Sequence, residues 1–135
     1  MDQSEDVGLL LKRITECLDK IANQNLKQID LTLSQGRILM FLQARKSVKT
    51  SQKDIEDFFD VSHPTVIGIL ERLETKGFIR SEFDSVDKRV KNIYLVPEKE
   101  SSVYILLSDF RKTLEQQLLM GLTDRQITDL RSSLR

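Results

Sequence analysis

The sequence is poor in cysteine and histidine, and these shortages exclude several classes of function. Cys17 is the only cysteine, so no disulfide can form within the chain, which fits a reducing compartment. His63 is the only histidine, which leaves little from which a zinc or iron site could be built. The sequence also lacks a glycine-rich phosphate loop and a Ser-His-Asp set for nucleophilic catalysis. We therefore predict neither an enzyme nor a protein with a bound metal or cofactor.

Long apolar runs and an excess of one charge are missing as well. No stretch approaches the roughly 18–20 apolar residues of a membrane span. The N-terminal segment, residues 1–6, is acidic where a signal peptide would be basic. We expect a cytoplasmic protein without membrane association. The 21 basic residues are balanced by 21 acidic ones, so bulk attraction to nucleic acid is not expected. Any nucleic-acid site must be local, and the basic residues that cluster are Lys88, Arg89 and Lys91.

The chain does have the composition of a folded domain and begins with an amphipathic segment. Of its 135 residues, 39% are hydrophobic and 31% are charged, which is ordinary for a globular protein. Apolar residues near the N-terminus repeat at alternating spacings of four and three, which predicts a helix with one apolar face. A helix this apolar needs a partner surface, either the core or a second subunit. The stripe consists of Val7, Leu11, Ile14, Leu18 and Ile21, widened by Leu10 and Cys17.

Two polar caps predict the starts of two helices in the middle of the chain. Residues 32–35, Thr-Leu-Ser-Gln, have the pattern of a capping box, so a helix is expected from about residue 34 to residue 45. Thr50 and Ser51 offer hydroxyl caps to a brief second helix that ends near Asp60. The spacing of its apolar residues predicts a buried face made of Ile55, Phe58 and Phe59.

A third helix and a hairpin follow directly. Ser62 is expected to cap this helix, and Gly77 suits the left-handed residue that ends it. Residues 78–84 and 90–96 are short β-branched and aromatic segments, which predicts two strands. The polar residues 84–89 between them form the turn, so the basic cluster lies in and just after this turn.

The C-terminal part returns to helical spacing. A long helix is expected from Pro97, with an interruption at Gly121, and a capping box at residues 123–126 starts a last helix. We therefore predict a mainly α protein with a small β-hairpin, of the α+β class. The expected parts are residues 1–31, 32–96 and 97–135. The apolar stripes of the last two helices are Val103, Leu107, Phe110, Leu114 and Leu118, then Ile127, Leu130 and Leu134.

Two short helices joined by a tight turn, followed by a hairpin with a basic tip, have the order of a winged helix-turn-helix. The major groove of B-DNA, about 12 Å wide, admits one helix, while a basic loop beside that helix reaches phosphates or the minor groove. The helix that begins at Ser62 leaves His63, Thr65, Ile67 and Gly68 facing outward. We therefore predict a domain that binds double-stranded DNA.

Four segments resemble the MarR-type transcription regulators. They are VSHPTV (61–66), LERLE (70–74), KGFI (76–79) and DKR (87–89), and the order of helices is similar from about residue 9 to residue 134. The resemblance implies a homodimer whose first and last helices form the interface, on a pseudo-palindromic operator. It also implies a repressor that a small-molecule effector or another signal releases.

The resemblance assigns roles to individual residues. Arg89 would enter the minor groove with Asp87 bracing it, and residues 62–65 would meet the major groove. Gly68 stands where many members carry a longer polar side chain, so base contacts are expected to be sparse. The residues expected to bind DNA are Thr50, Ser51, Gln52, Ser62, His63, Pro64, Thr65, Gly68, Arg72, Asp87, Lys88, Arg89 and Lys91. Those expected to form the dimer interface are Leu10, Leu11, Ile14, Leu18, Leu118, Leu122, Ile127 and Leu130.

Alternative functions stay open at this point. A winged helix can act as a protein–protein interaction module, which the balanced charge permits, although the basic hairpin favours DNA. One branch of the family carries a peroxide-sensing cysteine in the first helix, where Cys17 lies. Its apolar neighbours Ile14 and Leu18, however, predict a buried structural thiol. A coiled-coil structural protein would leave the hairpin without a purpose.

Overall fold

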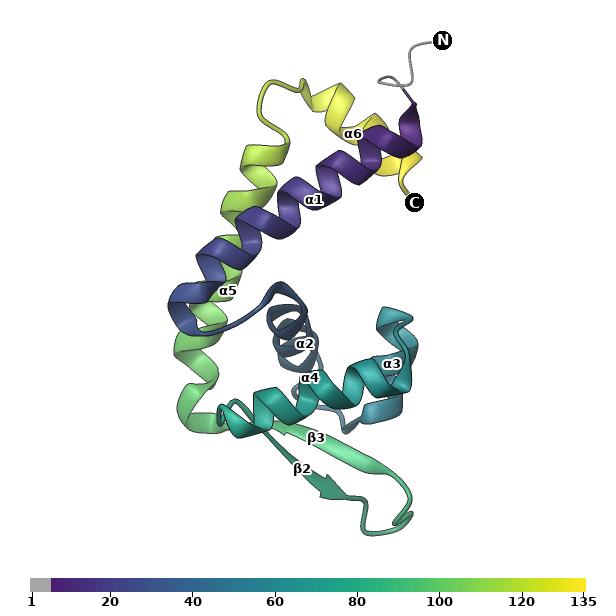
Figure 1. Ribbon diagram of the computed structural model, residues 1–135, viewed down its shortest axis with the longest axis vertical. Coiled ribbons are helices and arrows are strands. Elements are labelled where there is room, and N and C mark those ends of the chain that lie inside the picture. The colour runs from purple at the N-terminus through teal and green to yellow at the C-terminus, as the bar shows by residue number, and fades with distance from the viewer. Residues whose placement is uncertain (1–5) are drawn as a thin grey trace.

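The computed structural model describes residues 6–135, apart from the side chains of Glu100 and Ser101. Most of the acidic N-terminal run therefore lies outside the described residues. Figure 1 shows one lobe made of α2, α3, α4 and a hairpin, from which α1, α5 and α6 extend. The helices are α1 (Val7–Leu26), the 3-10 turn η2 (Lys27–Ile29), α2 (Leu33–Ala44), α3 (Gln52–Phe59), α4 (His63–Thr75), α5 (Pro97–Leu118) and α6 (Asp124–Ser133). The strands are β1 (Thr50–Ser51), β2 (Ile79–Phe83) and β3 (Lys91–Leu95). The predicted fold class is confirmed.

Capping boxes fix where three of the helices begin. The hydroxyl oxygen of Thr32 accepts a hydrogen bond from the backbone N–H of Gln35, whose side-chain oxygen accepts one from the N–H of Thr32. The predicted box at the start of α6 is formed in the same way. Ser51 and Asp54 form a third box at the start of α3, which the sequence analysis did not identify. Each box satisfies backbone donors that have no partner within the helix.

The turns around α4 depend on residues in the left-handed region. Asp60 ends α3 at a φ of 51°, and Gly77, as predicted, ends α4 at a φ of 82°. Ser62 occupies the N-cap position of α4, but the expected cap bond is not among the bonds that the structure describes. Its hydroxyl instead shares a hydrogen bond of 2.9 Å with the hydroxyl of Thr65.

The sheet has three antiparallel strands in the order β1-β3-β2, one more than the sequence predicts. β2 and β3 form the predicted hairpin, with Ser81 opposite Ile93, and β1 adds Thr50 opposite that same Ile93. A strand of two residues is too short to show an alternating pattern. β1 is a strand only because β3 lies beside it.

The core lies where α2, α3, α4 and the sheet meet. Ile55 and Leu73 are fully buried there, while Phe58, predicted to face inward, is 66% exposed. Phe58 instead stacks on the outside against Phe41 and Phe59, with ring centroids 4.4 and 4.9 Å away. The prediction failed for Phe58 because Phe59 takes the place against the core, and Phe58 packs against the rings of Phe41 and Phe59 outside it. The buried core residues are Leu26, Leu31, Ile38, Leu39, Leu42, Ile55, Val66, Leu70, Leu73, Phe78, Ile79, Ile93 and Leu107.

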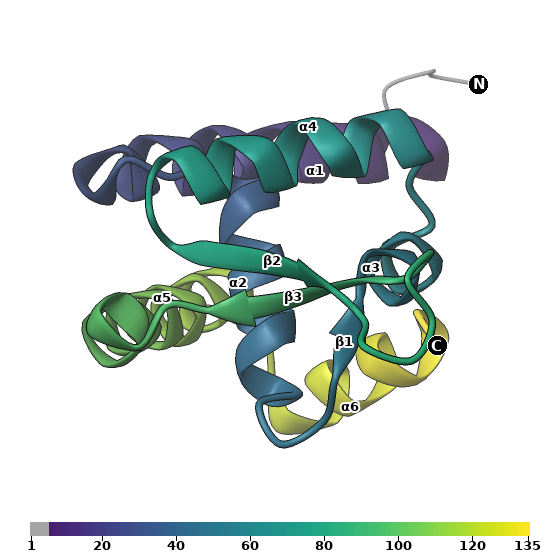
Figure 2. The ribbon, with the colours of Figure 1, turned by 90° about the horizontal axis from the view of Figure 1, so that it is seen from below.

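The outer helices leave apolar surface uncovered. α1 packs against α2 and η2, whereas α5 packs against α2, and Figure 2 shows α1 on one side of the molecule with α5 and α6 on the other. Val7 is 69% exposed and Ile14 is 49% exposed. Cys17 is exposed too, so the expectation of a buried thiol is wrong for the single chain. Much of the apolar stripe around Cys17 is therefore not covered by other parts of the same chain.

Within residues 6–135, no helix combines the length and the apolar character that a membrane span needs.

Candidate nucleic-acid interface

The first turn of α4 is presented to solvent. The inner face of the helix, Val66, Leu70 and Leu73, is buried, and this fixes which side of α4 faces solvent. Ser62, His63, Pro64 and Thr65 are all exposed at the N-terminal end. The helix therefore offers its N-terminal face to a partner, while its apolar face fixes its orientation.

Packing within the chain does not demand a glycine at position 68. A Cβ placed on Gly68 would have as its nearest described neighbour the guanidinium Nη1 of Arg72 at 3.7 Å, an ordinary contact. Gly68 is half-buried, and Arg72 is exposed. This stretch of α4 is therefore narrow and leaves room for close approach of another molecule.

One groove, here called the hairpin groove, separates α4 from the wing. Gln52 and Lys53 of α3, His63 and Ile67 of α4, and Arg89 and Lys91 of the hairpin are among the residues that line it. Figure 2 shows the hairpin running along α4, with its turn at the α3 end. The basic hairpin and the exposed start of α4 therefore lie on the same side of the molecule.

A second groove, here called the α2 groove, follows the opposite flank of α4. It is lined by Thr65, Arg72 and Lys76 of the α4 segment and by Ser34 and Arg37 of α2, among others. Arg37 is exposed on α2, and the sequence analysis did not select it because an arginine on an otherwise apolar helix carries no motif. Only the tertiary structure places it beside Arg72.

Lys76 has a structural role at the end of this groove. Its ammonium group donates to the backbone oxygen of Asp30 at 2.6 Å and to the side-chain oxygen of Gln35 at 3.0 Å. The bonds tie the C-terminal end of α4 to the start of α2. Position 76 therefore belongs to the framework that holds α4, whereas Arg37 and Arg72 are exposed beside it.

The turn of the hairpin is held by Asp84. Its carboxylate accepts hydrogen bonds from the backbone N–H groups of Val86 and Asp87, both at 3.0 Å. It also accepts one from the side-chain amide of the buried Asn92 at 2.9 Å and one from the Lys49 ammonium at 3.3 Å. These bonds, led by those from Asp87 and Asn92, hold the pKa of Asp84 far below its ordinary value. The turn is therefore built around an ionised carboxylate.

Asp87 orients Arg89 at the hairpin tip. The carboxylate of Asp87 accepts from Nε of Arg89 at 3.1 Å, from Nη2 at 3.2 Å and from its backbone N–H at 3.1 Å. These bonds lower the pKa of Asp87. The Arg89 side chain is 91% exposed, and exposed ion pairs add little to stability. The contact therefore serves mainly to restrict the direction of the guanidinium group.

Most of the predicted DNA-binding residues gather on this face, but Thr50 does not. It is only 2% exposed, because it lies in β1, and its hydroxyl accepts from Nε of Arg45 at 3.0 Å. Its assignment to the binding surface is therefore wrong. Ser51 is half-buried, and its hydroxyl caps α3. Lys88 is exposed beside Arg89.

The described residues offer no metal site. No cluster of three or more histidine, cysteine, aspartate or glutamate side chains in residues 6–135 is placed to hold a metal ion. This face carries hydrogen-bonding side chains and exposed basic residues, among them Arg72, Lys88 and Arg89, together with acidic residues of α3 and α4.

A helix-turn-helix made by α3 and α4, supported by α2 and followed by a two-stranded wing, defines a winged helix-turn-helix protein.

Comparison with known proteins gives the family. The profile of the MarR family matches residues 29–90. The HTH-type transcriptional regulator YwoH of Bacillus subtilis (strain 168) is 31% identical over 105 residues, which are 78% of this chain and 74% of YwoH. The HTH-type transcriptional regulator YybA of the same organism is 27% identical over 113 residues, which are 84% of this chain and 73% of YybA. The chain belongs to the MarR family; it is a DNA-binding transcription regulator and not an enzyme.

A solved structure agrees over nearly the whole length. MepR of S. aureus, in its crystal structure with DNA, superposes with a TM-score of 0.88 at 30% identity. The match covers 95% of this chain and 93% of that one, so it includes the outer helices as well as the winged part.

Asp84→Ala is expected to loosen the hairpin turn while the core stays folded. The backbone N–H groups of Val86 and Asp87 lose their acceptor, so hydrogen exchange at these amides should become at least about tenfold faster by NMR. In the wild-type protein the folded pKa is depressed. Protection should therefore persist as the pH falls through 3.8, the ordinary value of an Asp carboxyl, and be lost only below it. Glu82→Ala, in the exposed part of β2, is the matched control. Unchanged exchange in Asp84→Ala would show that the turn does not depend on this carboxylate.

Proposed function

We propose that this chain is a homodimeric repressor that binds a pseudo-palindromic operator with α4 in the major groove. The observation that carries the proposal is the exposed first turn of α4 between two grooves with basic residues on their rims. A helix seated in a major groove has a sugar-phosphate backbone along each flank. The hairpin groove and the α2 groove suit these two backbones. The solved MepR–DNA complex supports the proposal.

The basic residues divide between the two flanks of α4. Lys88, Arg89 and Lys91 serve the hairpin side, with Arg89 directed to the minor groove by Asp87. Arg72 and Arg37 serve the other side as phosphate contacts. The remaining proposed contacts are Ser51, Gln52, Ser62, His63, Pro64, Thr65 and Gly68. Because the net charge is zero, this local clustering supplies the attraction. A DNA-binding regulator needs access to the chromosome, so we propose that the protein is located in the cytoplasm.

Binding should depend steeply on salt, with log affinity falling by about 0.9 per phosphate neutralised for each unit of log salt. Arg89→Ala is expected to weaken operator binding by about 1–3 kcal/mol, because a groove contact is lost. Fluorescence anisotropy with a duplex selected from random DNA measures both. Arg125→Ala, on the outer helix α6, is the control and should bind as the wild type does. A flat salt response would favour the protein–protein interaction module instead.

The dimer interface is proposed on the uncovered faces of α1, α5 and α6. Large exposed apolar side chains that lie together on a small protein mark an interaction site. Leu10 and Leu11 are 42% and 48% exposed on α1, Leu118 is 42% exposed at the end of α5, and Leu122 is 38% exposed in the segment between α5 and α6. Leu18 and Ile127 are half-buried. The proposed interface consists of Leu10, Leu11, Ile14, Leu18, Leu118, Leu122, Ile127 and Leu130.

Ile14→Asp should break the dimer, because it would bury an unpaired carboxylate in an apolar interface. Light scattering at micromolar concentration is expected to give a dimer for the wild type and a monomer for this variant. Lys20→Asp introduces the same charge at an exposed position of α1 and should remain dimeric. A wild-type monomer would contradict the proposal.

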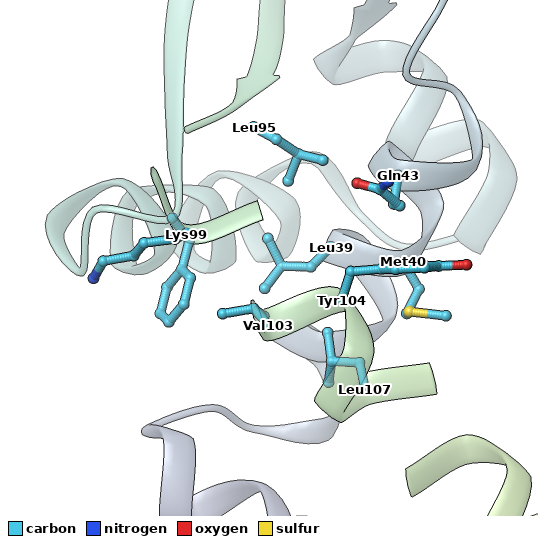
Figure 3. A pocket seen from close by; sticks show the side chains of 9 residues that line it. Leu39, Met40, Gln43, Leu95, Lys99, Val103, Tyr104 and Leu107 are labelled. Carbon is cyan, nitrogen blue, oxygen red and sulfur yellow. The ribbon is translucent and has the colours of Figure 1, made fainter. Parts of the chain in front are cut away.

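An effector site is proposed between the winged part and the outer helices. The small cavity in Figure 3, lined by Met40, Gln43 and Tyr104 among others, has a volume of about 20 Å³ and holds no more than a water molecule. A larger groove of about 670 Å³ lies between α2, α3 and α5, with Phe41 and Phe110 in its wall. Gln43 also lines it, and its side-chain oxygen has no hydrogen-bond partner among the described residues. Size and lining suit an aromatic compound with one polar group.

The dye 8-anilinonaphthalene-1-sulfonate, an aromatic anion, tests this groove. It should bind with increased fluorescence and weaken operator binding about tenfold if it favours the released conformation by about 1.4 kcal/mol. Ala44→Trp fills the groove and should reduce the fluorescence, whereas Ser47→Trp lies outside the groove and should not. Equal fluorescence in the wild type and Ala44→Trp would place the dye elsewhere and contradict the proposal.

A further inference from the structure

The only histidine of the chain is held by a carboxylate from the neighbouring helix. His63 opens α4, and its ring nitrogen Nδ1 is hydrogen-bonded to Oε1 of Glu56 on α3. The Glu56 side chain is 17% exposed, whereas the His63 side chain is 62% exposed. The carboxylate is thus largely enclosed, and the ring that it holds projects from the proposed DNA-binding face.

Gln52 lies beside both groups, and the charge of Glu56 decides which ring nitrogen carries the proton. Its side-chain Nε2 lies 3.4 Å from Oε1 of Glu56 and 3.3 Å from Nδ1 of His63. Desolvation raises the pKa of Glu56, but the hydrogen bonds from His63 and Gln52 outweigh it and the net pKa is lowered. An ionised carboxylate only accepts hydrogen bonds, so Nδ1 must carry a hydrogen that it donates to Glu56. The amide of Gln52 then donates to Glu56 as well.

This assignment leaves Nε2 of His63 as the ring nitrogen available to a partner. In the neutral ring Nε2 is then an acceptor, and in the protonated ring it is a donor. The base edges of the major groove distinguish these two states. Amino groups of adenine and cytosine donate, while N7 and O6 of guanine accept. The ring keeps its position in both states because Glu56 holds Nδ1 throughout.

We propose that Glu56 is a positioning residue that fixes His63 as the Nδ1–H tautomer, so that protonation of the ring reverses its hydrogen-bond polarity toward one base pair. The proposal rests on the proposed function, because it requires α4 to lie in the major groove. The inference adds that the base preferred at one position of each half-site differs between acidic and alkaline pH. Imidazole is the side-chain group whose protonation proteins most often use as a pH switch.

Other charged groups border the same groove and come from several elements. The lining includes acidic groups on α3 and α4 and basic groups on α3 and the hairpin, so carboxylates and cations face His63 together. Glu56 is distinguished from the others by its direct contact with the ring. The charged residues of the lining are Lys53, Glu56, Glu71, Glu74, Arg89 and Lys91.

The tautomer can be measured without DNA. Because His63 is the only histidine, the full-length protein gives a single pair of imidazole ¹⁵N signals. At alkaline pH, once the signals no longer change with pH, the wild-type shifts should be those of the Nδ1–H form. Glu56→Gln keeps the shape but removes the charge, and its signals should move toward the Nε2–H form. Wild-type shifts of the Nε2–H form would overturn the proposal.

Selection of random duplexes tests the consequence. Between about pH 8 and about pH 6, one base-pair position in each half-site should change its preferred base by about fivefold in the wild type, with the other positions unchanged. His63→Ala should lose this change but still bind, and Glu56→Gln should show a weaker preference at both pH values. Specific binding without any change of base would overturn this inference and leave the proposed function standing. Absence of specific duplex binding at either pH would overturn both.

Discussion

The burial of one face of α4 is the constraint on which the rest of the structure depends. Val66, Leu70 and Leu73 pack into the core beneath the helix, and burying three such side chains is worth on the order of 5 kcal/mol. The apolar face fixes the rotation of α4 about its axis. Thr65 is exposed because it points to the other side of the helix, and His63 is exposed because it lies in the first turn, ahead of Val66. The same packing that stabilises the domain therefore decides which side chains of α4 face solvent.

Polar contacts hold the parts of the structure that lie beyond the hydrophobic core. The hairpin turn extends beyond any apolar support, and Asp84 holds it by accepting two backbone N–H groups together with the buried Asn92 amide. His63, at the exposed end of α4, is held in the same manner by Glu56. In both places an ionised carboxylate, fixed at the edge of the core, orients a group that faces solvent.

The outer helices α1, α5 and α6 bury less of their apolar surface than the helices of the winged part do. The core includes Leu26 at the end of α1 and Leu107 in α5, with Val103 and Phe110 packed against it, but Val7, Leu11 and Ile14 of α1 and Leu118 of α5 are exposed. The groove lined by residues of α2, α3 and α5 lies where these outer helices join the winged part.

The sequence by itself determined the order of helices, the capping boxes at Thr32 and Thr123, the hairpin and the family, because these depend on local spacing and on short motifs. It also selected most of the candidate surface, because outward positions on α4 follow from its apolar period. Only the tertiary structure decided that Thr50 is buried in β1, that Phe58 and Cys17 are exposed and that Arg37 lies beside Arg72. The tertiary structure alone also places Glu56 in contact with His63. The physical reason is that burial and pairing depend on neighbours from distant parts of the chain, or on a second chain, and these leave no periodic trace in the sequence.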